Sequence, residues 1–102
     1  MEQKAPYRIV TSSFLAKLAA LKLHSNRVAI VLGKTIYLYN TSKEEFLNDA
    51  KWLKHELCHI AQFKQYGFFT FIIKYLWESL WHGYYNNKYE VEARKAEEET
   101  LC

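Results

Sequence analysis

The chain has 102 residues, of which 50% are hydrophobic and 17% aromatic, and it carries a formal charge of +3. This length allows one modest core, so we expect a single minimal domain over residues 1–102, folded and mainly helical instead of disordered. The lysines are scattered instead of clustered, and no recognition motif accompanies them. The charge therefore does not indicate a nucleic-acid partner.

The cysteines and the first residues bear on the cellular compartment. Cys58 and Cys102 are too few for a disulfide framework, which favours a reducing environment. Residues 1–6 contain no apolar stretch of the kind that a secretory signal needs. We therefore expect a cytoplasmic protein.

The first expected elements are a helix and a hairpin. Residues 12–24 predict an amphipathic helix with a serine cap, and its apolar stripe, expected to pack on the core, is formed by Phe14, Leu15, Leu18 and Leu21. The segments Arg27 to Leu32 and Thr35 to Asn40 are rich in Val, Ile and Tyr, which favours strands. Gly33-Lys34 separates them, so we expect an antiparallel hairpin.

A long amphipathic helix is expected next. Ser42 and Glu45 match the capping-box pattern, which predicts a start near residue 43. Gly67 suits a left-handed cap at the far end, so the helix would have about twenty residues and a length of roughly 30 Å. Its apolar residues recur at spacings of one, three and four, and they are Phe46, Leu47, Ala50, Leu53, Leu57, Ile60 and Ala61.

Residues 68–81 form the most apolar and aromatic run of the chain. The run is too short to span a bilayer, and Lys74 and Glu78 interrupt it, so we expect no transmembrane segment. We expect a core helix packed on the preceding one, with an aromatic surface for a membrane or a protein partner as the alternative. After His82-Gly83 the chain is expected to turn and to end in a charged helix from about residue 88. The predicted fold is α+β: an N-terminal helix, a β-hairpin, a central helix and two further helices.

The central helix carries the motif His55-Glu56-Leu57-Cys58-His59. Residues four apart lie on one face of a helix, so His55 and His59 can both offer a ring nitrogen to one zinc ion. In sites of this kind the glutamate is not a ligand but the general base that activates water, which assigns this role to Glu56. Cys58 is expected to be a small buried side chain.

A catalytic zinc needs a third protein ligand. The metzincin pattern would require Gly and His where this chain has Gln62 and Gln65, and the only aspartate, Asp49, precedes the motif. The remaining candidates are His82, Glu78, Glu90, Glu92 and the acidic run from Glu97 to Glu99. Glu90 could also complete a capping box with Asn87, and helix geometry alone leaves Glu90 and Glu92 undecided.

The motif followed by a helix that bears Glu90-x-x-Ala93 resembles the gluzincin zinc metallopeptidases. In length and element order the chain is similar to the minimal gluzincin domains called minigluzincins. The resemblance implies a zincin-like fold, Zn²⁺ as cofactor, Glu90 as third ligand and a peptide or protein as substrate. Arg94 stands where the gluzincin pattern has an aspartate that orients a zinc-bound histidine, and Glu97 or Asp49 could replace it.

Further residues are candidates for contacts with the substrate. His82, Tyr84 and Tyr85 could stabilise an oxyanion opposite the metal. The resemblance implies that the strand from Thr35 to Asn40 lies along the cleft, where Tyr37 would line the substrate path and an extended peptide could add as a strand.

The sequence leaves two alternatives to an active peptidase: a latent form and a non-catalytic protein. Minigluzincins include latent forms, in which a terminal segment, here Glu97 to Cys102, would lie in the cleft. The alternative function is a non-catalytic scaffold, zinc-bound or metal-free, that binds a protein partner or contacts a membrane peripherally through the aromatic helix.

Overall fold

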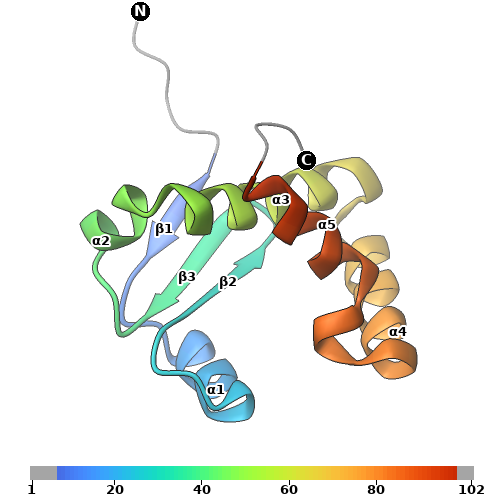
Figure 1. Cartoon of the computed structure of the whole chain (residues 1–102), viewed down its shortest axis with the longest axis horizontal. Coiled ribbons are helices and arrows are strands. Elements are labelled where there is room, and N and C mark those ends of the chain that lie inside the picture. The colour runs from blue at the N-terminus through green and yellow to red at the C-terminus, as the bar shows by residue number, and fades with distance from the viewer. Residues whose placement is uncertain (1–6, 99–102) are drawn as a thin grey trace, which may run out of the picture.

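The structure is a computed structural model that describes residues 7–98. Within this part of the chain it has the predicted α+β composition, with five helices and one three-stranded sheet (Figure 1). The elements in chain order are β1 (Arg8–Val10), α1 (Phe14–Leu23), β2 (Val28–Leu32), β3 (Thr35–Tyr39), α2 (Lys43–Asn48), α3 (Ala50–Tyr66), α4 (Phe68–Asn86) and α5 (Lys88–Ala96).

The sheet has the strand order β1-β3-β2. The predicted hairpin is confirmed, because β2 and β3 pair antiparallel and Gly33 adopts a positive φ of 65° between them. β1 was not predicted, since three residues are too few to show an alternating pattern. It pairs parallel to β3, with Ile9 opposite Ile36. β3 is therefore the central strand, and β2 forms one edge of the sheet.

Helices cover both faces of the sheet. In Figure 1, α2 and α3 run along one side of the strands and α1 lies on the other. The α3 side holds the larger core, whose buried members are Val31, Ile36, Leu38, Phe46, Phe63, Phe71 and Tyr89. On the other side Ala16 and Ala20 of α1 pack against Val28.

The predicted packing face of α1 is wrong. Ser13 does cap the helix, since its side chain accepts a hydrogen bond from the backbone amide of Ala16. However, Phe14 is 72% exposed and Leu21 66% exposed. The small alanine side chains face the sheet instead, because they allow the helix backbone to lie close to the strands.

The predicted twenty-residue helix is in fact two helices. The Ser42–Glu45 capping box is present at the start of α2. At Asp49 the backbone is extended, with φ −94° and ψ 93°, and the Asp49 carboxylate caps α3 by accepting from the Trp52 amide at 3.1 Å. Local capping by a short acidic side chain thus competes with helix continuation. α3 still carries the motif in its middle and ends at Gly67, whose φ is 90°.

α4 differs from the predicted core helix in burial. Its backbone leaves the helical conformation at Gly83, with φ 80° and ψ 169°, where a turn was predicted, and a short helical piece then runs to Asn86. Phe71 is its one fully buried residue, and it packs against Phe63 and Tyr89. Most of the other large apolar side chains of α4 are exposed. Among the described residues, no helix is long and apolar enough to cross a membrane.

Candidate metal centre

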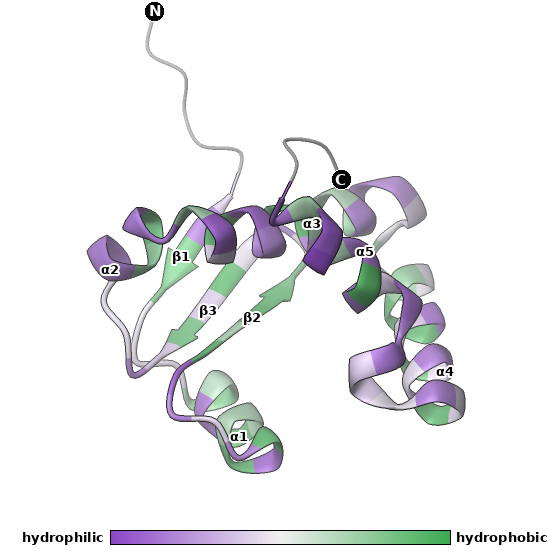
Figure 2. Ribbon diagram, viewed as in Figure 1, coloured by the Kyte–Doolittle hydropathy of each residue, from purple (hydrophilic) through white to green (hydrophobic). Residues whose placement is uncertain are grey.

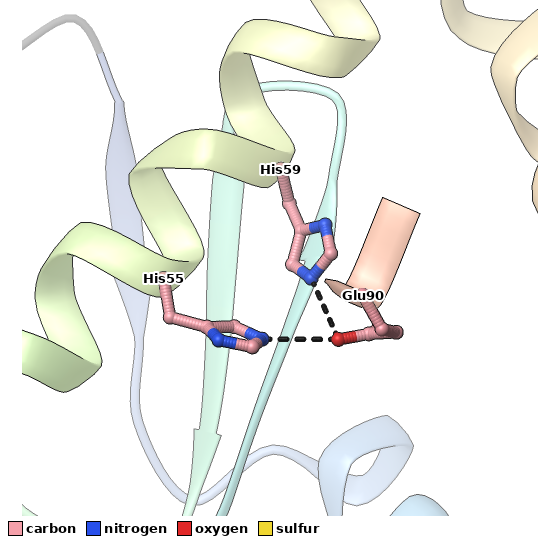
Figure 3. Close-up of side chains that lie close together, drawn as sticks. All are labelled: His55, His59 and Glu90. Carbon is pink, nitrogen blue, oxygen red and sulfur yellow. Dashed lines mark hydrogen bonds and ion pairs between the residues drawn. The ribbon is translucent and has the colours of Figure 1, made fainter. Parts of the chain in front are cut away.

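Packing of α5 on α3 brings the motif histidines to Glu90. Cys58 on α3 is buried with Ala93 and Ala96 on α5, and these small side chains let the two helices lie close together. His55 and His59, one turn apart on α3, point toward the first turn of α5 (Figure 3). Their Nε2 atoms lie 3.0 and 3.2 Å from the same Glu90 oxygen, Oε1.

Each histidine ring is also held at its outer nitrogen. His55 Nδ1 donates to Glu97 Oε2 at 2.7 Å, and His59 Nδ1 donates to Gln62 Oε1 at 2.9 Å. These acceptors place a proton on both Nδ1 atoms and direct both Nε2 atoms at Glu90. Such outer hydrogen bonds fix the tautomer and ring orientation that a metal-binding histidine needs.

The Gln62 amide is itself fixed by two hydrogen bonds. Its Nε2 donates to the backbone carbonyl of Tyr89 at 3.2 Å and to Glu92 Oε1 at 2.7 Å. The amide oxygen is therefore the atom that faces His59. Glu92 contacts Gln62 instead of the histidines, so it supports the cluster from outside.

The carboxylate of Glu90 is fully engaged. Its second oxygen, Oε2, accepts a hydrogen bond from the Tyr75 hydroxyl. Burial alone would raise the pKa of Glu90, but hydrogen bonds from His55, His59 and Tyr75 outweigh burial and hold this pKa far below its usual range. The capping-box alternative for Glu90 is not realised, because Asn87 caps α5 through the Tyr89 amide while the Glu90 side chain faces the histidines.

Glu90 in turn raises the pKa of both histidines. Burial alone would lower the pKa of His59, but the hydrogen bond and the charge of Glu90 raise it to about 9. Burial would also lower the pKa of His55, but the hydrogen bond to Glu90 and nearby negative charges raise it. Glu90 therefore favours the protonated form of both imidazoles, and a metal cation would take the place of their inner protons.

The donor set and its spacing fit zinc. The three possible ligand atoms from His55, His59 and Glu90 all lie within 4.8 Å of one another. Tetrahedral zinc with bonds of about 2.0–2.1 Å separates its ligand atoms by roughly 3.3 Å, close to the 3.0 and 3.2 Å measured to Glu90. Two imidazoles and one carboxylate form a common catalytic zinc set, whereas calcium and magnesium prefer oxygen ligands throughout.

Glu56 is buried next to His55, His59 and Glu90 but is not one of the three possible metal ligands. It is 5% exposed and borders the open space beside the histidines. Burial raises its pKa to about 7, although the positive charges of His59 and His55 act in the opposite direction. The role of general base stays a prediction for Glu56.

Two cavities meet at the motif residues. One, of about 490 Å³, has a mainly apolar lining that includes Phe63, Ile72 and Leu76. The other, of about 710 Å³, has a more polar lining that includes Arg27 and Asp49. His55, Glu56 and Tyr84 border both cavities, as do residues of β2. The strand along the cleft is thus β2 instead of the predicted segment Thr35 to Asn40, because that segment is the central strand.

The structure brings only one of the four predicted substrate-contact residues to the cleft. Tyr84 borders both cavities, and burial together with the negative charges of Glu90 and Glu56 raises its pKa above its usual range. His82 is exposed and borders neither cavity among the described residues. Tyr85 packs under the Arg94 guanidinium at 3.8 Å, and Tyr37 lies on the central strand.

Arg94 is directed away from the histidines. Its guanidinium donates to the Tyr85 carbonyl at 2.6 Å. The acceptor for His55 is Glu97, the C-cap residue of α5, which lies about two turns after Glu90 and which the sequence indicated only as an option beside Asp49. Asp49 caps α3 instead.

Gln62 and Tyr75 were missed as members of the site. Gln62 lies three residues after His59, a spacing that places it on the same helix face, and this could have identified it. Tyr75 gave no local signal, because its approach to Glu90 depends on how α4 packs. Glu78, one of the other candidate ligands, accepts from the Lys88 amide at the start of α5.

Cys58 is buried as predicted, with 1% exposure, but it is disulfide-bonded, contrary to the expectation of a reduced thiol. A disulfide bond does not favour a reducing compartment, and cytoplasmic localisation stays a prediction. The other cysteine, Cys102, lies outside the described residues, as do Glu99 and most of the predicted tail segment.

Comparisons of the chain with models of known protein families, with curated proteins and with solved structures found no match.

Proposed function

We propose that the protein binds one zinc ion through His55, His59 and Glu90 and hydrolyses peptide bonds with Glu56 as general base. The observation that carries the proposal is the convergence of both Nε2 atoms on Glu90 while both Nδ1 atoms are held by separate acceptors. A histidine pair that served only to pack would not need all four ring nitrogens oriented in this way.

Zinc held by these residues would supply Lewis acidity, polarising the scissile carbonyl and making an attacking water more acidic. Glu56 would accept the proton of that water and deliver it to the leaving amide nitrogen. Its raised pKa suits a group that must both accept and release a proton near neutral pH. A divalent cation nearby would lower this pKa and favour the carboxylate form that acts as base.

Tyr84 is the candidate for stabilising the oxyanion. Its hydroxyl is protonated at neutral pH, as in any tyrosine whose pKa is not lowered, and its place between the two cavities puts an O–H donor beside the reacting centre. Tyr75 would have a different role, because its hydroxyl is committed to Glu90. We assign it to positioning the ligand.

The substrate in this proposal is an extended peptide that pairs with β2. β2 is an edge strand, so its outward backbone groups are available for a further strand. It also borders both cavities, which would place the added strand across His55 and Glu56.

The arrangement of elements supports the further proposal of a zincin-like, gluzincin-type domain. α3 with the motif covers one face of the sheet, and the glutamate helix α5 packs on α3. Glu97 would take the place of the aspartate that the gluzincin pattern has at Arg94, since it accepts from the zinc-site histidine.

The test of catalysis separates the base from the metal. Purified protein loaded with zinc should cleave members of a peptide library, and Glu56→Gln should lose this cleavage while it retains zinc. Equal cleavage by both proteins would contradict the assignment of Glu56 and point to another enzyme in the sample.

The test of the metal site uses two glutamates of the same helix. Glu90→Ala should lose zinc, and the matched control Glu92→Ala should keep it, because Glu92 contacts Gln62 instead of a histidine. Zinc retained by Glu90→Ala and lost by Glu92→Ala would show that the ligand assignment is wrong.

A non-catalytic scaffold is the second candidate function. The exposed aromatic residues of α4 favour it, since a helix that served only the core would bury them. A protein that binds zinc but cleaves no peptide in the library would support the scaffold over the peptidase.

A further inference from the structure

α4 carries a continuous apolar stripe on the face turned away from the core. The residues Phe69, Ile73, Leu76, Trp77, Leu80 and Trp81 recur at spacings of four, three and one, so they share one helix face. All six are at least 60% exposed, and Phe69 reaches 76%. An amphipathic helix normally turns such a stripe inward. Here the inward face is a second one, formed by Phe71, Ile72 and Tyr75.

α1 carries a shorter stripe of the same kind. Phe14, Leu18 and Leu21 lie on one helix face, and each is exposed. At 100° per residue, Lys17 and Lys22 lie on the two sides of this stripe. α1 contains no acidic residue.

The two helices that carry the stripes border the same cavity. Lys22 and Leu23 of α1 and Ile72 and Leu76 of α4 are among the residues that line the cavity of about 490 Å³. In Figure 2, α1 lies below the strands and α4 lies beside them at the lower right, and both carry hydrophobic residues along their length. Phe71 and Ile72 of α4 pack on the core beneath α3, so the α4 stripe faces away from that core.

The two helices that carry the stripes have a positive net charge. Together α1 and α4 contain three lysines and one glutamate, a difference of +2. That glutamate, Glu78, accepts a hydrogen bond from the Lys88 amide and so serves the start of α5. Lys17, Lys22 and Lys74 are all exposed.

We propose that the α1 and α4 stripes dock on the surface of an anionic lipid bilayer. Tryptophan and other large apolar side chains flanked by lysines are the composition of helices that lie in the membrane interface. The lysines complement anionic headgroups, whereas an apolar protein partner gives no reason for the positive rim. None of the zinc-site residues belongs to the stripes, so the membrane-docking proposal does not depend on whether the protein is a peptidase.

The test is co-sedimentation of the whole chain with vesicles of phosphatidylcholine alone and of phosphatidylcholine with phosphatidylserine. We expect binding to the anionic vesicles, weaker binding to neutral ones, and a blue shift of tryptophan emission on binding. The double variant Trp77→Ser/Trp81→Ser should lose binding. Val91→Ser, which removes an exposed apolar side chain from α5, is the matched control and should bind like the wild type.

The lysines provide a second, separate readout. Each lysine near an anionic surface contributes about 1 kcal/mol, or roughly five-fold in affinity, so Lys17→Gln/Lys22→Gln should bind about 25-fold more weakly. Lys64→Gln on α3 removes the same charge from an exposed site outside the two stripes and should have little effect.

Three results would overturn the proposal. The first is no binding to either kind of vesicle, and the second is equal binding by the tryptophan double variant with its circular dichroism unchanged. The third is a dimer in sedimentation velocity that becomes monomeric in the same variant, which would assign the stripes to a second copy of the chain.

Discussion

Glu97→Ala removes the acceptor that holds the outer nitrogen of His55. In the structure Glu97 Oε2 lies 2.7 Å from His55 Nδ1, and the Glu97 side chain is only 29% exposed. Without this acceptor the His55 ring can rotate and change tautomer, so its Nε2 is less often available to zinc. Loss of an outer hydrogen bond of this kind lowers metal affinity by about 10-fold to 100-fold, which corresponds to roughly 1.4–2.7 kcal/mol.

The assay is competition for zinc against a chromophoric chelator at fixed pH. The neighbouring variant Glu98→Ala is a matched control, because it removes the same charge and an ion pair with Lys51 at 3.2 Å. That pair is exposed, and the ring nitrogens of His55 bind Glu97 and Glu90 instead. We expect the Glu97 variant alone to bind zinc more weakly. Equal zinc affinity in the two variants would refute the role given to Glu97.

Three further predictions concern Arg94, His59 and Asp49. Arg94→Ala should leave the zinc affinity unchanged in the chelator assay, since the guanidinium points away from the ligands; a tenfold loss would contradict this. Below pH 9, zinc must displace the proton that Glu90 stabilises on His59, and also any proton held on His55, so affinity should rise at least tenfold per pH unit from pH 7 and level off near pH 9. A constant affinity over this range, measured by isothermal titration, would refute that proton displacement. Asp49→Ala removes the α3 cap from the Trp52 amide and should lower the free energy of unfolding by about 1 kcal/mol in urea titrations, whereas an unchanged midpoint would mean that the cap is not stabilising.

The elements with strong local signals were predictable from the sequence. The hairpin, the serine caps, the capping box at Ser42 and the end of α3 at Gly67 all depend on short-range chemistry, and each is present. The break at Asp49 was missed because the apolar periodicity continues across it, while the cap that interrupts the helix there depends on one side chain.

Long-range packing decided what the sequence could not. α4 has apolar residues on two of its faces. Only the position of α3 and α5 determines that Phe71 is buried while Trp77 is exposed. The same holds for the ligand set: spacing left Glu90 and Glu92 undecided, and the packing of α5 turns Glu90 to the histidines. Tyr75 joins the site only because α4 crosses next to α5.

Anomalous scattering at the zinc edge from crystals of the zinc-loaded protein tests the central claim most directly. We expect one strong peak at bonding distance from His55 Nε2, His59 Nε2 and a Glu90 oxygen, with Glu56 close by but not bonded. The absence of a peak at these three side chains, or a peak held by other residues, would contradict the proposed metal centre.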